Sequence, residues 1–282
     1  MLLIIKMCSL LLLTSRLGRT SRLLTTPRKL TFGILRLSGL EISKKLLYQT
    51  NQFYNFSMKS FIHYLKLALV AIPLLAFQQD KPVRIVFFGD SITQAGVRPG
   101  GYIVKMGEML EKQGLKDKYE LIGAGIGGNK VYDLYLRLED DVLAKQPNIV
   151  VIYVGVNDVW HKASSGTGTD PDKFVRFYEA LLKKFKAANI RVAMCTPAVI
   201  GERTDFSNQQ DGDLNRYSQL IRDLAKKQGL PLIDLRKAFL DYSLKNNPNN
   251  DEKNILTTDR VHLNDAGNQL VADEMWKVLK GM

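Results

Sequence analysis

From residue 80 onward, short runs of mainly apolar residues alternate with longer segments in which polar positions interrupt the apolar ones. The short runs are rich in Val, Ile, Leu and Phe and predict buried strands, whereas the longer segments predict helices. The strands are expected at 83–88, 119–122, 148–154, 191–196 and 230–235, and the helices at 102–113, 129–144, 171–188, 211–228 and 265–280. This alternation indicates an α/β fold with a five-stranded parallel sheet covered on both faces.

Turn-forming residues separate these segments. The stretch 123–128 reads Gly-Ala-Gly-Ile-Gly-Gly and is expected to be a glycine-rich turn after the second strand. Polar loops are expected at 160–170 and 199–210. About 200 residues with five strands suffice for one self-contained core, so residues 80–282 are predicted to form a single domain.

The first 79 residues have a different pattern. Residues 1–57 show no sustained helical or strand period, whereas Met58-Lys59-Ser60 is a short basic start, with Lys66 following and an apolar run at 67–77. This layout is typical of a secretory signal peptide, and the apolar run is too short to span a bilayer comfortably. We therefore expect a signal peptide at 58–79, a secreted or periplasmic protein without stable membrane insertion after processing, and an extension at 1–57 that is not translated. An organelle-targeting sequence and a membrane-anchored tail are the alternatives.

The net charge of +12 is concentrated in this N-terminal part. Residues 1–79 carry 11 of the 40 lysines and arginines but only one of the 28 acidic residues, Glu41. The rest of the chain is nearly neutral, so its charge does not favour a nucleic-acid partner. The only cysteines, Cys8 and Cys195, provide neither a disulfide framework nor a cysteine-based zinc site.

Ser91 follows the first predicted strand within Gly89-Asp90-Ser91. Open parallel sheets bind ligands beyond the carboxyl ends of their strands, and a serine there is well placed to act as a nucleophile. Taken alone, Gly-Asp-Ser is more typical of a turn that caps a helix than of a nucleophile.

A nucleophilic serine needs a base, and residues 80–282 contain two histidines, His161 and His262. Asp259 precedes His262 by three residues, so its carboxylate can fold back onto one imidazole nitrogen and leave the other for the serine proton. Asp-x-x-His alone also fits a surface turn before a helix. His161 is the rival base, but it has no such acidic neighbour.

Acyl transfer also needs donors for an oxyanion. Gly128 closes the glycine-rich turn, where its N–H is not shielded by a side chain, and Asn157 follows the third strand with its amide at the same sheet edge. Each position also fits an ordinary strand-ending turn.

Together these motifs resemble the SGNH, or GDSL, hydrolase family over roughly residues 82–280. The resemblance is carried by Gly89-Asp90-Ser91, Gly128, Gly155-x-Asn157-Asp158 and Asp259-x-x-His262, in the family's order and at similar spacing. It implies a flavodoxin-like three-layer α/β/α sandwich that needs no metal or other cofactor. One departure is Gly123, which stands where the family often has asparagine; we expect it to alter local hydrogen bonding and not the chemistry.

The resemblance also implies roles for these residues. Ser91 would be the nucleophile, His262 the general base and acid, and Asp259 the residue that orients His262. The oxyanion would be held by the Ser91 and Gly128 N–H groups and the Asn157 amide, with Asp90 and Asp158 as neighbours in the site.

The substrate is predicted less closely. The family includes lipases, lysophospholipases, arylesterases and carbohydrate O-deacetylases, and this chain lacks a long apolar lid segment. We expect a serine esterase for short acyl esters, above all acetyl groups on a small molecule or a sugar polymer. A lipase-type acylhydrolase acting on lipids is the alternative. Trp160 is equally suited to stacking on a sugar ring and to packing in the core.

Two further interpretations compete. Gly123, Gly125 and Gly128 match a dinucleotide-binding fingerprint, but it follows the second strand, and the nearest strand-ending acid, Asp158, lies 30 residues beyond Gly128. The chain could also be a non-catalytic carbohydrate- or lipid-binding relative, although every expected catalytic position is filled.

Overall fold

The computed structural model describes residues 81–282, together with residues 44, 47–49, 52, 58, 60–63 and 65. The chain divides into two compact units, Met1–Gln79 and Asp80–Met282. The described residues of the first unit are helical, whereas the apolar run 67–77, expected to be the core of a signal peptide, lies outside the described residues. No helix within the described ranges is long and apolar enough to cross a membrane.

The second unit contains a five-stranded sheet in the order β2-β1-β3-β4-β5, and every neighbouring pair is parallel. Its strands are β1 (Val83–Gly89), β2 (Tyr119–Gly125), β3 (Ile149–Tyr153), β4 (Arg191–Cys195) and β5 (Leu232–Ile233). Gly89 pairs with Gly125 on one side and Tyr153 on the other, so β1, β2 and β3 end at the same edge. The predicted five-stranded parallel sheet is confirmed.

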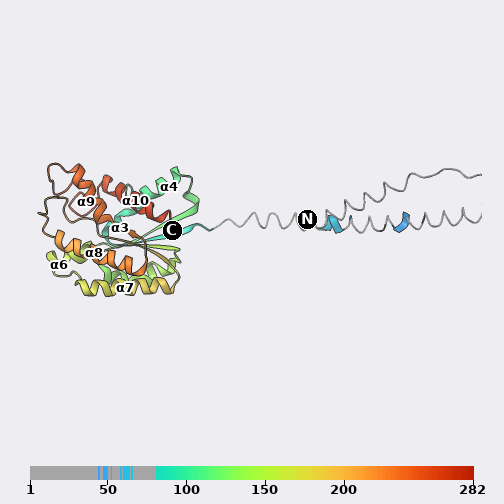
Figure 1. Ribbon diagram of the computed structural model, residues 1–282, viewed down its shortest axis with the longest axis horizontal. Helices are drawn as coiled ribbons and strands as arrows, with labels where there is room; N and C mark the ends of the chain where they lie inside the picture. The colour runs from blue at the N-terminus through green and yellow to red at the C-terminus, as the bar shows by residue number, and fades with distance from the viewer. Residues whose placement is uncertain are drawn as a thin grey trace, which may run out of the picture. The chain divides into compact units, whose positions relative to one another are not determined.

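Helices cover both faces of this sheet, which confirms the three-layer sandwich. Figure 1 shows α4, α9 and α10 on one side of the strands and α7 and α8 on the other. The helices are α3 (Ser91–Gly96), α4 (Tyr102–Lys112), α5 (Val131–Asp141), α6 (Val156–Ser165), α7 (Pro171–Ala187), α8 (Asp211–Gln228), α9 (Leu235–Asn246) and α10 (Asp265–Leu279), with 3-10 turns η1 (Lys116–Lys118) and η2 (Leu143–Lys145).

The two central strands explain why the sheet is covered on both faces. All residues from Ile85 to Phe88 in β1 and from Ile149 to Ile152 in β3 are fully buried. Side chains of successive strand residues point to opposite faces, so an unbroken apolar run is stable only when both faces are packed.

The second strand is longer than predicted, because β2 continues through Gly123 and Gly125. Helix α3 lies directly against this part of the strand. A Cβ added at Gly125 would lie 2.1 Å from the Gln94 backbone nitrogen, and one at Gly123 would lie 2.3 Å from Val97 Cγ1. Gly123 and Gly125, which were expected in the turn, are therefore strand residues that let a helix approach the sheet closely, and the turn itself begins after Gly125.

Three helices were not predicted from the sequence. Helix α3 begins only two residues after β1 and has six residues, too few for a visible helical period. Helix α6 occupies half of the expected loop at 160–170 and ends at Gly166, whose φ is +66°. Helix α9 follows β5 at once, and β5 itself has two residues where six were expected.

Candidate active site

The end of β1 places Ser91 at the carboxyl edge of the sheet. Gly89 is the last strand residue, and a Cβ there would lie 2.3 Å from the Tyr153 carbonyl oxygen. Asp90 then caps α3, because its Oδ1 accepts a hydrogen bond of 3.0 Å from the Ile92 N–H. Ser91 is the first residue of α3, so its backbone N–H is one of those that an intrahelical bond cannot satisfy.

His262 and Asp259 meet Ser91 at this edge. Ser91 Oγ lies 3.0 Å from His262 Nε2, and His262 Nδ1 lies 2.7 Å from Asp259 Oδ2. An Nδ1–H that donates to the carboxylate leaves Nε2 as the acceptor for the serine hydroxyl proton. The arrangement can therefore remove a proton from Ser91 and return it to a leaving group.

Backbone groups hold the Asp259 carboxylate in its charged form. Its Oδ1 accepts hydrogen bonds from the N–H groups of Val261 at 3.1 Å and His262 at 2.8 Å. Partial burial opposes ionisation, but these backbone bonds and the bond from the imidazole outweigh it and lower the pKa of Asp259 below its usual value. A carboxylate that stays ionised keeps the imidazole in one orientation.

Glu202, which sequence reasoning missed, supports the segment that carries Asp259 and His262. Its side chain is buried, and its two carboxylate oxygens accept from Ile255 N–H at 2.8 Å and Leu256 N–H at 2.7 Å. The neighbouring Gly201 N–H donates to the Arg260 carbonyl at 2.9 Å. No local pattern distinguishes a single glutamate in a loop, so the sequence offered no signal for it.

Gly128 and Asn157 come from the ends of β2 and β3. Gly128 has a φ of +77° in a turn closed by a hydrogen bond from Asn129 N–H to the Ile126 carbonyl, a position that favours glycine. Asn157 lies in the first turn of α6, is 2% exposed, and donates one Nδ2–H to the Asn129 carbonyl at 3.1 Å. The second Nδ2–H remains for another acceptor.

Two carboxyl groups are buried beneath this edge. Burial, together with the nearby charge of Asp158, raises the pKa of Asp90 to about 7 against the hydrogen bond from Ile92. Burial likewise raises the pKa of Asp158 to about 6, and this carboxylate lies 3.2 Å from the Val131 nitrogen at the start of α5. Both groups thus fix helix starts beside the site.

The same contacts argue against a dinucleotide site. A ribose would need an acid that is free at the end of a strand. Asp158 is fully buried and already accepts from Val131, and two of the three fingerprint glycines, Gly123 and Gly125, pack against α3 and its C-terminal end.

His161 lies beside Gly128, and no hydrogen bond joins it to Ser91 within the described chain. A Cβ added at Gly128 would lie 3.8 Å from His161 Cε1, so this imidazole borders the glycine turn. Burial lowers the pKa of His161, and the nearby charge of Lys130 lowers it further. Trp160 lies between the two histidines, with its ring centroid 5.8 Å from that of His161 and 6.3 Å, edge-on, from that of His262.

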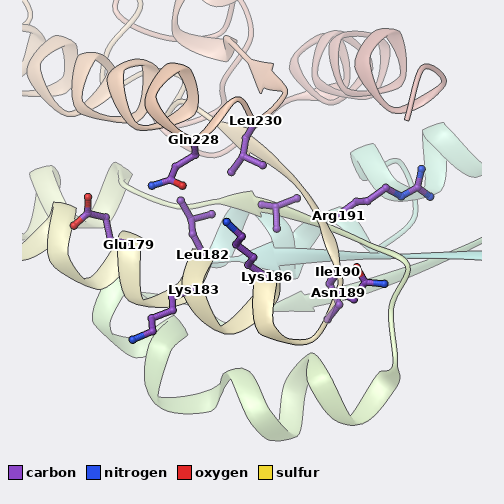
Figure 2. Close-up of a pocket in the computed structure, with 10 residues that line it drawn as sticks. Glu179, Leu182, Lys183, Lys186, Asn189, Ile190, Arg191, Gln228 and Leu230 are labelled. Atoms are coloured by element: carbon purple, nitrogen blue, oxygen red, sulfur yellow. The ribbon is translucent and has the colours of Figure 1, made fainter.

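A separate pocket of about 460 Å³ opens at the other edge of the sheet, where β4 begins and where α7 and α8 end (Figure 2). It is lined by Glu179, Leu182, Lys183, Lys186, Asn189, Ile190, Arg191, Val192, Gln228 and Leu230. These residues include no serine, histidine or aspartate, so the pocket lacks the groups that acyl transfer needs. Among the residues the structure describes, no group of three or more His, Cys, Asp and Glu side chains is placed to hold a metal ion.

Comparisons with known proteins agree with this geometry. A crystal structure of an acetyl xylan esterase, AlAXEase, is 65% identical in sequence and superposes with a TM-score of 0.68, covering 69% of this chain and 98% of that one. An acetylxylan esterase of Geobacillus stearothermophilus is 28% identical over 207 residues, which are 67% of this chain and 90% of the relative. An isoamyl acetate-hydrolyzing esterase 1 homolog of Bos taurus is 24% identical over 208 residues, covering 70% and 81% of the two chains.

The family model of the GDSL-like Lipase/Acylhydrolase family matches residues 87–270, a range that runs from β1 into α10 and includes Ser91, Asp259 and His262. The predicted family is therefore confirmed, and with it the serine-esterase interpretation over the nucleotide-binding and non-catalytic ones. The chain belongs to the GDSL-like Lipase/Acylhydrolase family and is a carboxylic ester hydrolase.

Proposed function

We propose that Ser91, His262 and Asp259 are the catalytic triad of an esterase that removes acetyl groups from carbohydrate. The observation that carries the proposal is the unbroken series of contacts from Ser91 Oγ to His262 at 3.0 Å and from His262 to Asp259 at 2.7 Å. This is the geometry that general-base activation of a serine requires.

The reaction proceeds in two halves. His262 Nε2 takes the proton from Ser91 Oγ as the oxygen attacks the ester carbonyl, and the resulting oxyanion accepts hydrogen bonds from the Ser91 and Gly128 N–H groups and from the Asn157 amide. When the tetrahedral intermediate collapses, the proton on His262 passes to the leaving alcohol. A water, deprotonated by His262, then attacks the acetyl-enzyme, and the proton returns to Ser91 Oγ as acetate leaves.

The relatives support acetate as the acyl group. Their names specify acetyl xylan or isoamyl acetate, which share the acetyl group and differ in the alcohol. The 65% identity to AlAXEase over 98% of that chain favours a sugar, in particular acetylated xylan, as the alcohol part. Trp160, half-buried beside His262, offers an aromatic side chain on which a sugar ring can stack.

The test is the release of acetate from acetylated xylooligosaccharides, run beside nitrophenyl esters of increasing acyl length. We expect activity on the sugar and on the acetate ester that falls as the acyl chain lengthens. Ser91→Ala should lower kcat by at least about 10,000-fold on both substrates. Preference for long acyl chains would favour lipid substrates instead, and an unchanged rate in Ser91→Ala would refute the nucleophile.

We also propose that the enzyme is exported. The support is the short basic start at 58–60, with Lys66 following and the apolar run at 67–77. Mass spectrometry of the N-terminus of the native protein provides the test: export by this signal predicts a first residue near position 80, whereas a peptide from residues 1–57 in the mature protein would contradict it.

A further inference from the structure

Arg137 on α5 connects the backbone around the expected oxyanion donors. Its Nη2 donates to two carbonyl groups at the ends of adjacent strands, that of Gly89 at 2.8 Å and that of Ala124 at 3.1 Å. Its Nε donates to Asn129 Oδ1 at 2.7 Å. The guanidinium also lies over the Phe88 ring at 4.6 Å and pairs with Asp141 at 2.7 Å, so its position is fixed from several sides.

Asn129 connects Arg137 to the third expected donor, the Asn157 amide. Its side chain is held by Arg137, while its backbone carbonyl accepts the Asn157 Nδ2–H at 3.1 Å. An amide that gives one hydrogen to a fixed carbonyl presents the other in a fixed direction. The direction of the free Asn157 N–H therefore depends on where Asn129 lies.

The turn that contains Gly128 is also held by Asn129. Asn129 is its last residue and closes it onto the Ile126 carbonyl, and the Ile126 N–H donates to the Gly89 carbonyl at 3.2 Å. Gly89 stands two residues before Ser91. One guanidinium thus contacts the supports of all three oxyanion donors.

We infer that Arg137 is a positioning residue, which acts through Asn129 to set the spacing and direction of the oxyanion donors; the inference rests on the proposed function. An arginine suits this task because its planar group donates in several fixed directions at once, whereas a lysine has a single rotating ammonium. Because small displacements in an oxyanion hole weaken transition-state binding more than ground-state binding, the loss should appear in kcat.

The experiment is a double-mutant cycle with nitrophenyl acetate on the full chain. Arg137→Met, which keeps an unbranched apolar stem against Phe88, should lower kcat by roughly 10- to 100-fold with KM changed less than about threefold. In an Asn157→Ala background the same substitution should have a smaller effect, because one of the three donors that Arg137 positions, the one reached through Asn129, is gone. Arg137→Lys should restore little of the rate.

Arg84→Met is the matched control. Arg84 joins β1 and β2 at the opposite edge of the sheet, with bonds to Glu120 and to the Lys145 carbonyl. It should leave kcat unchanged and lower the melting temperature only slightly. If Arg137→Met does not give folded protein, Asn129→Ala carries the test, since it removes the Oδ1 acceptor and keeps the carbonyl that Asn157 uses.

The outcomes separate the two proposals. An effect of Arg137→Met that multiplies fully with that of Asn157→Ala, or no effect on kcat, overturns the role of Arg137 while the triad stands. No effect of Asn157→Ala alone removes that residue from the oxyanion hole and overturns both the hole and the inference built on it. A lower kcat that is coupled to Asn157 supports the inference.

Discussion

The two edges of the sheet use the same residue types for different purposes. At the amino edge, Arg84 pairs with Glu120 at 2.7 Å, with both side chains more than one-third exposed. At the carboxyl edge, Arg137 has a side chain that is 15% exposed and donates to strand carbonyls and to Asn129. Exposed ion pairs contribute little to stability, whereas buried charge-assisted bonds fix geometry.

The backbone is therefore fixed by buried hydrogen bonds at the carboxyl edge and not at the amino edge. The amino edge satisfies its polar groups with one another and with solvent. The carboxyl edge uses buried groups to hold the backbone so that the Ser91 and Gly128 amides, within the described part of the chain, donate to no protein acceptor. Such preorganised donors are what a site for a developing negative charge requires.

The largest effect should separate the two histidines at the carboxyl edge. His262→Ala removes the group 3.0 Å from Ser91 Oγ and should lower kcat by at least about 10,000-fold. His161→Ala, at the neighbouring position beside Gly128, should cost far less than the roughly 100-fold minimum typical of a lost general base. Steady-state kinetics on nitrophenyl acetate decide this, and equal losses in both variants would reject His262 as the sole base.

Two asparagines, one before and one after β3, allow a direct comparison of the amino and carboxyl edges. Asn157→Ala should lower kcat by about 100- to 1,000-fold, because it removes an oxyanion donor. Asn148→Ala, just before the other end of the strand, removes an exposed side-chain acceptor that lies 2.7 Å from the backbone nitrogen of Arg84. It should leave kcat unchanged and reduce the free energy of unfolding by about 1 kcal/mol, measured by urea denaturation. A comparable loss of rate in both variants would contradict the division between the edges.

Glycine substitutions compare the packing of α3 against β2 with that of an ordinary helix. Gly125→Ala would push a methyl group into the α3 backbone, 2.1 Å from the Gln94 nitrogen, and should lower the free energy of unfolding by about 3 kcal/mol. Gly107→Ala in α4 meets no atom within 4 Å and should raise it by roughly 0.5 to 1 kcal/mol. Denaturation of the two variants provides the measurement, and a tolerated Gly125→Ala would show that α3 can move away from the strand.

Asp90, buried at the carboxyl edge, should have an effect on stability that depends on pH. Because its folded pKa of about 7 exceeds its usual 3.8, the folded protein keeps a proton that the unfolded chain loses, and stability falls as pH rises through this window. Asp90→Asn does not titrate and retains an acceptor for Ile92, so its stability relative to the native protein should rise by about 3 kcal/mol between pH 4 and pH 7. Both proteins contain Asp158 and His262, so the comparison isolates the change at position 90. Parallel stability curves across this range would contradict the prediction.

The sequence was sufficient to predict features that depend on local pattern. The central strands are unbroken apolar runs, which only a sheet covered on both faces can bury, and Asp259 reaches His262 because three residues separate them in a turn. Ser91, Gly128 and Asn157 lie at one edge because β1, β2 and β3 end there. The segment before α10 then brings Asp259 and His262 to Ser91.

Features that depend on distant partners could not be predicted in this way. Gly123 and Gly125 have the composition of a turn, and their place in a strand follows from α3, which lies about 30 residues earlier in the chain. Arg137 is one charged residue on an amphipathic helix, and Glu202 is one acid in a loop. Their roles depend on carbonyl and amide groups supplied by other segments.

The contact between Ser91 and His262 spans 171 residues of sequence. During synthesis Ser91 and the whole parallel sheet emerge before His262, so a nascent chain that ends before Asp259 has all five strands but lacks two members of the proposed triad. With the proposed triad, ester hydrolysis begins only when the last segment has docked onto the sheet. The appearance of activity can therefore be used to time the completion of folding.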